Sequence, residues 1–224
     1  MDARLIAGSL LIAAGASVIS TPIANADIAF SRNGNPGFHT GTATATTSGP
    51  NTRAIAIGKN SSAAARGANS RAVAIGDNAG AGAFDGTGNR ALVVGDNSTA
   101  SAGEGDNNRA TTYGDNSWSS AAIGSYHTAT VKGNNSSAAS IDGGGNTARV
   151  TGDNNSGYIL RSSNSTVTVT GHDNNAGLID SYDTALTASG SGNTAEYSVC
   201  RGQNIVMDST DETAITTCTV GQEQ

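Results

Sequence analysis

A glycine recurs at a fixed interval of nineteen residues through the middle of this 224-residue chain. The periodic glycines are Gly76, Gly95, Gly114, Gly133, Gly152, Gly171 and Gly190, and Gly58 stands eighteen residues before the first of them. Such self-similarity predicts one supersecondary unit stacked on copies of itself. A disordered low-complexity chain has no reason to keep this phase, so the repeat outweighs an aromatic content of only 4%.

Small apolar residues alternate with other residues just before each periodic glycine. The positions four and two residues before the glycine are Ala, Val or Leu in every coil, with the exception of Thr112. This alternation is typical of a strand with one buried face. A weaker apolar segment follows each turn. The pattern predicts an all-β, single-domain β-solenoid, of the β-roll or β-helix kind, with coils of about 19 residues, two short strands per coil and a thin interior.

The turns repeat as well. An Asn stands two residues after each glycine from Gly58 to Gly152, and Asp173 takes its place after Gly171. A second near-column contains Asn89, Asn108 and Asn146, and appears one residue out of step at Asn51, Asn69 and Asn164. Asn accepts the left-handed backbone conformation and bonds to its own turn, so both columns are interpreted as turns.

The calcium β-roll motif is incomplete, so no metal or cofactor is expected. His127 and His172 fall in turn columns, and we expect both in solvent.

The first three coils are apolar on both sides of one strand. The residues three and one positions before the glycine are Ile55, Ile57, Val73, Ile75, Leu92 and Val94. A strand that is apolar on both faces must be covered on both. Three interpretations stay open: a second subunit packs there, the segment Thr40–Thr47 folds over it, or the coils reverse so that Ile and Val are inside and Ala is outside.

The ends of the chain differ from the repeats. Residues 1–26 have the basic start, apolar run and Ala-Asn-Ala site of a secretory signal peptide, so we expect an exported, secreted or surface-associated protein with no membrane span after signal removal. Residues 27–50 are assigned to an N-terminal extension or cap, 51–192 to the solenoid repeats and 193–224 to atypical C-terminal coils. Cys200 and Cys218 lie about one coil apart, which predicts a disulfide between neighbouring coils, with two free thiols as the alternative.

Two families share short motifs with the chain. The segments Arg53–Asn60 and Arg71–Asn78 resemble the Ser-Val-Ala-Ile-Gly repeats in the heads of trimeric autotransporter adhesins. That resemblance implies a bacterial β-roll that trimerises and binds host matrix; the coil period here is longer, and no heptad stalk or C-terminal barrel follows. The turns Gly86–Ala91, Gly105–Ala110 and Gly143–Ala148 resemble those of curlin repeats, which form extracellular fibres, although the regular Gln of that family is missing.

These features favour a structural or adhesin-like surface or matrix protein over an enzyme. No hydrolase, zinc-protease or phosphate-loop motif occurs. The formal net charge is −6 and Lys and Arg form no blocks, so no nucleic-acid partner is expected. Matrix proteins, glycans and further copies of the chain are the expected partners. A carbohydrate-binding or carbohydrate-modifying solenoid is the alternative, with Tyr113, Trp118 and Tyr126 as a possible glycan platform and lateral packing as their other role.

Overall fold

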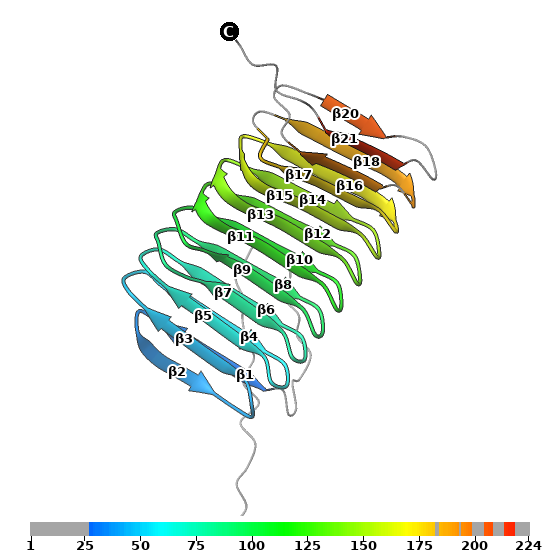
Figure 1. Ribbon diagram of the computed structural model, residues 1–224. Helices are drawn as coiled ribbons and strands as arrows, with labels where there is room; N and C mark the ends of the chain where they lie inside the picture. Colours follow the sequence, from blue (N-terminus) through cyan, green and yellow to red (C-terminus); the bar gives the residue numbers. More distant parts are fainter. Residues whose placement is uncertain (1–26, 182–183, 193, 199–203, 208–212, 218–224) are drawn as a thin grey trace, which may run out of the picture.

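A computed structural model describes residues 27–181, 184–192, 194–198, 204–207 and 213–217, and all regular structure in these ranges is β-strand. Each coil contributes one strand to each of two sheets, so successive strands alternate between the sheets and the chain forms the expected β-solenoid (Figure 1). We call the 11-stranded sheet, ordered β2-β1-β4-β6-β8-β10-β12-β14-β16-β18-β20, sheet A, and the 10-stranded sheet, ordered β21-β19-β17-β15-β13-β11-β9-β7-β5-β3, sheet B.

The strands of sheet A are β1 (Ile28–Arg32), β2 (Asn35–His39), β4 (Arg53–Ile57), β6 (Arg71–Ile75), β8 (Arg90–Val94), β10 (Arg109–Tyr113), β12 (Thr128–Lys132), β14 (Thr147–Thr151), β16 (Thr166–His172), β18 (Ala185–Ser191) and β20 (Asn204–Met207). The strands of sheet B are β3 (Thr44–Ser48), β5 (Ser62–Arg66), β7 (Gly80–Ala83), β9 (Thr99–Gly103), β11 (Trp118–Ser125), β13 (Ser137–Gly144), β15 (Ser156–Ser163), β17 (Asn175–Ile179), β19 (Thr194–Ser198) and β21 (Thr213–Thr217).

The two ends of the stack are built differently. At the N-terminal end, β1 and β2 pair antiparallel with each other, and β1 pairs antiparallel with β4, which covers the open edge of sheet A. Strand β3 already pairs in parallel with β5 in sheet B. At the other end, β20 and β21 continue the parallel pairing of the two sheets. The expected signal peptide and the expected Cys200–Cys218 bridge lie outside the described residues.

Small side chains fill the space between the sheets. In the first coils the core is mostly alanine, and Ala54 and Ala56 are fully buried. Later coils bury Val150, Val169 and Ile159 instead, so the interior side chains grow along the stack. A glycine compensates for this growth, because a Cβ at Gly157 would lie 2.7 Å from Cγ2 of Val150. A larger side chain on one sheet is therefore matched by a smaller residue on the facing sheet, so that the sheets stay closely packed.

The periodic glycines from Gly58 to Gly171 lie at turns where the next coil leaves no room for a side chain. Gly95 has a φ of +149°, and a Cβ there would lie 2.1 Å from the carbonyl oxygen of Gly114 in the next coil. The same relation holds along the column, which gives the nineteen-residue period a physical cause. A second glycine column at the opposite turns was not anticipated; its members are Gly67, Gly86, Gly105, Gly124 and Gly143.

Buried polar side chains connect the turns of successive coils. The Nδ2 of Asn108 donates to the carbonyl oxygens of Gly103, at 3.0 Å, and Gly124, at 2.7 Å, while its Oδ1 accepts from the backbone N–H of His127 at 2.9 Å. At the other turn, Ser117 Oγ donates to the Gly133 carbonyl and accepts from the Ser136 N–H. These bonds satisfy backbone groups that the strand ladders cannot reach.

The second near-column of asparagines therefore has two different roles. Asn51, Asn69 and Asn164 have positive φ on exposed turns, as the sequence predicts. Asn89, Asn108 and Asn146 are instead fully buried. These three lack the expected left-handed backbone, because the one-residue offset points their side chains into the stack, but each side chain does bond to a carbonyl of its own turn.

Candidate interaction surface

Four parallel rows of side chains run along the first coils, three on the outer face of sheet A and a fourth on the turns that follow its strands. An arginine row stands at the start of the strands, formed by Arg53, Arg71, Arg90 and Arg109. Two aliphatic rows follow, with Ile55, Val73 and Leu92 in the first and Ile57, Ile75 and Val94 in the second. An acidic row stands on the turns that follow the strands, formed by Asp77, Asp96 and Asp115. In-register parallel pairing aligns all four rows along the stack.

The arginine row was not anticipated from the sequence, although Arg stands five residues before the glycine in four successive coils. Parallel pairing sets Arg71 between Arg53 and Arg90, about 4.8 Å from each along the stack. Burial lowers the pKa of Arg71, and the like charges of its two neighbours lower it further. The Arg53 guanidinium lies 5.8 Å from the centre of the Phe30 ring, and its Nε is buried without a hydrogen bond. Within the described part of the chain, the arginine row forms no ion pair.

The aliphatic rows lie on the face opposite the alanine core. Ile55 and Val73 are only 6% and 8% exposed, whereas Val94 and Tyr113 are 36% and 40% exposed. A hollow of about 280 Å³ on this face is lined by both aliphatic rows together with Arg71, Arg90 and Arg109. No described strand lies over this face, because every described strand belongs to sheet A or sheet B.

Two of the three sequence interpretations of these residues are wrong. The coils are not reversed, because Ala54 and Ala56 point inward and are fully buried. The segment Thr40–Thr47 does not cover the face, because Thr44–Ser48 forms β3 in the opposite sheet. Contact with a second subunit stays a prediction for Ile55, Ile57, Val73, Ile75, Leu92 and Val94.

The acidic row is held by the backbone. Oδ1 of Asp96 accepts the N–H of Asp77 at 2.7 Å, and Oδ1 of Asp115 accepts the N–H of Asp96 at 2.8 Å. Lys59 takes the equivalent place in the preceding coil, where its N–H donates to Asp77, and Asn134 takes it in the following coil. These bonds fix one oxygen of each carboxylate along the stack, so the negative charges stand at a regular spacing on exposed turns.

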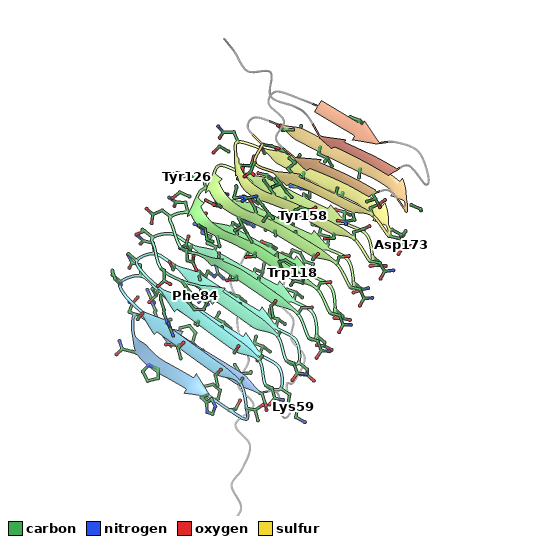
Figure 2. The ribbon with its side chains drawn as sticks, viewed as in Figure 1. Lys59, Phe84, Trp118, Tyr126, Tyr158 and Asp173 are labelled. Atoms are coloured by element: carbon green, nitrogen blue, oxygen red, sulfur yellow. The ribbon has the colours of Figure 1, made fainter. Side chains whose placement is uncertain are left out.

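The structure does not bring the three aromatic candidates together. Tyr113 ends β10 on sheet A, whereas Trp118 begins β11 on sheet B and is 45% exposed. Tyr126 follows β11 and is 68% exposed at the opposite edge of the stack from the Lys59 turn (Figure 2). The part of β11 from Trp118 to Ala122, about 13 Å long, separates the Trp118 end of the strand from the turn that holds Tyr126. A single flat glycan platform made of all three residues is therefore absent.

The histidines differ from each other in their surroundings. His172 is exposed on a turn, as expected, but His127 is fully buried, and the expectation of a solvated turn was wrong for it. Its ring occupies the column of Asn108 and Asn146, with Nδ1 3.3 Å from Ser140 Oγ and Nε2 without a hydrogen bond. Burial lowers the pKa of His127 against the opposing influence of nearby backbone carbonyls. The ring is out of reach of a substrate.

The described residues contain no cluster of three or more His, Cys, Asp or Glu that could hold a metal ion, and no helix that could cross a bilayer. Carboxylates at Asp85, Glu104, Asp142 and Asp180 share one turn column, which Ile123 and Arg161 interrupt. Arg161 pairs with Asp180 at 2.9 Å. No protein-family model, curated protein or solved structure matches the chain. The resemblance to the adhesin and curlin families is therefore limited to the short motifs.

Proposed function

We propose that the chain is an exported structural or adhesin-like protein of a cell surface or matrix, which acts through its extended repeat surface and not by catalysis. The observation that carries this proposal is the pair of aliphatic rows on the outer face of sheet A. The core between the sheets is already complete on the inner face, so these rows serve no purpose in closing it. Contiguous apolar side chains on an outer face are typical of an interaction surface.

The interior chemistry supports an architectural role. The buried Asn and Ser side chains bond to backbone groups of their own and neighbouring coils, which leaves them committed to holding the stack together. The outer faces vary from coil to coil, from aliphatic at β4 to threonine-rich at β16. A rigid stack with variable outer faces is suited to presenting binding surfaces.

Binding to surfaces tests this function. The full chain is applied to immobilised matrix proteins and polysaccharides, and the release of sugar reducing ends is measured in the same wells. We expect saturable retention without sugar release. Continuous sugar release would overturn the proposal in favour of a carbohydrate-modifying enzyme, and so would the absence of retention on every surface.

One pair of variants separates the glycan alternative from a broader adhesive surface. Trp118→Ala removes the exposed ring at the start of β11, and Tyr126→Ala removes an exposed ring at the opposite edge as a matched control. Retention on matrix proteins that survives both changes supports the proposal. Retention confined to polysaccharides and lost only in Trp118→Ala identifies a glycan-binding module instead.

A further inference from the structure

We propose that the partner of the aliphatic rows is a second copy of this chain, docked face to face with the two solenoid axes parallel and the coils in register. In this arrangement the arginine row of each copy lies opposite the acidic row of the other. The inference rests on the proposed function, because it names the partner of the same surface.

The order of the rows makes the face complementary to itself. The strand carries the arginine row and the two aliphatic rows over about 13 Å, from Arg71 to Ile75, and the acidic row follows on the turn after Gly76. A two-fold axis parallel to the stack, placed between the two aliphatic rows, exchanges the first row with the fourth and the second with the third. Both copies then use the same patch, as a closed two-fold dimer requires.

Charge selects the parallel orientation. With coils in register, Arg71 faces the second copy's Asp77, Arg90 faces its Asp96 and Arg109 faces its Asp115, and the two-fold axis repeats each pair. A two-fold axis along the strands would set arginine against arginine and aspartate against aspartate, which is repulsive.

The arginine row also needs such a partner. Burial, and after it the like charges of Arg53 and Arg90, disfavours the protonated form of Arg71, and opposing carboxylates would favour that form again. The first coil departs from the pattern, since Arg53 and Lys59 are both basic. It lies at the end of the stack, where Arg53 packs over Phe30 instead.

The apolar contact follows the same symmetry. Val73 faces the second copy's Ile75 and Leu92 faces its Val94, with the sheets about 10 Å apart. Four coils at about 4.8 Å, each with a strand about 13 Å long, present about 250 Å² of strand face. A stable dimer buries about 800 Å² per partner. The contact must therefore continue over the outer faces of β12, β14, β16 and β18, which carry Thr side chains and also the exposed Lys132 and Arg149.

Reciprocal charge reversal tests the pairing. One variant carries Arg71→Glu and Arg90→Glu, and the other carries Asp77→Lys and Asp96→Lys, which Lys59 shows the turn can accept. Sedimentation is measured on the full chain and on the chain beginning at Asp27, which contains every described residue. For the latter we expect a dimer for the unmodified protein, monomers for each variant alone and a dimer for their equimolar mixture. A monomeric unmodified chain, variants that stay dimeric or a mixture that stays monomeric would each overturn the inference.

A control variant and a second measurement distinguish loss of the dimer contact from misfolding of the variants. Ser101→Glu with Ser120→Glu adds charge on the outer face of sheet B and should leave the dimer intact. Arg90→Lys is a mild change that allows carbodiimide cross-linking, and the cross-link should join residue 90 of one copy to Asp96 of the other. Within one chain, β8 alone carries the backbone about 13 Å from residue 90 to Val94, before the turn that holds Asp96, which is too far for a zero-length bond. A dimer cross-linked through other residues only would overturn the parallel register, while surface retention would still report on the proposed function separately.

Discussion

Replacing Gly95 by alanine should destabilise the stack strongly, although it adds only one methyl group. The backbone φ of +149° is one that a residue with a side chain rarely adopts, and the added Cβ would lie 2.1 Å from the carbonyl oxygen of Gly114. That oxygen accepts the hydroxyl of Ser98 at 2.7 Å, so a shift that relieves the clash also breaks a buried hydrogen bond. The perturbation therefore acts on the spacing between two coils.

Three contributions set the size of the effect. A residue forced into a glycine-only conformation costs about 1–3 kcal/mol. Overpacking against a neighbouring backbone costs about 1–3 kcal/mol more. Loss of the hydroxyl–carbonyl bond adds about 1 kcal/mol. We expect a loss of about 4 kcal/mol in the free energy of unfolding, which for a domain of this size lowers the melting temperature by roughly 8–16 °C.

Gly144→Ala is the matched control. Gly144 has no positive φ, and the nearest atom to a Cβ there is the Ser125 carbonyl oxygen, at 3.9 Å. Thermal unfolding followed by circular dichroism should show a large decrease for Gly95→Ala and a change of a degree or two for Gly144→Ala. Equal melting temperatures for Gly95→Ala and the unmodified protein would refute the argument that contact between coils enforces the period.

Two further predictions concern the buried polar column. Asn108→Ala removes the donor to two carbonyls and the acceptor for the His127 N–H, and should cost about 3–5 kcal/mol in denaturant unfolding, whereas Asn107→Gly on the exposed turn next to it should change stability by less than about 0.5 kcal/mol. Because burial lowers the pKa of His127 below its ordinary value of 6.5, the unfolded chain binds the proton more readily, so stability should be full above about pH 6.5 and fall as the pH drops below it. In His127→Asn this part of the pH dependence should disappear, and its persistence in melting curves would assign it to other groups.

The sequence alone determined the coil length, the two strands per coil and the inward alternation. These features are repeated in every coil because each coil meets the same neighbour. Gly95 and its equivalents approach a carbonyl oxygen of the next coil so closely that only glycine fits. The sequence therefore contains a glycine at this position in each coil. Ala54 and Ala56 likewise indicated the inner face by their alternation, although the apolar residues between them left the direction open until the structure settled it.

Only the tertiary structure decided which turn residues point inward and which residues meet across a face. Asn107 and Asn108 are adjacent and chemically identical, yet one has positive φ at the surface and the other is buried, because the dihedral angles of the turn set the direction of each side chain. His127 follows the second of these directions, which its residue type did not indicate. The four-row surface depends on exact register between coils, since Arg71 and Asp77 belong to ordered rows only after parallel pairing stacks them on their equivalents. The repeated sequence pattern indicates which residue types pack between neighbouring coils. The backbone angles of the turns and the register of the stacked strands determine where each side chain lies.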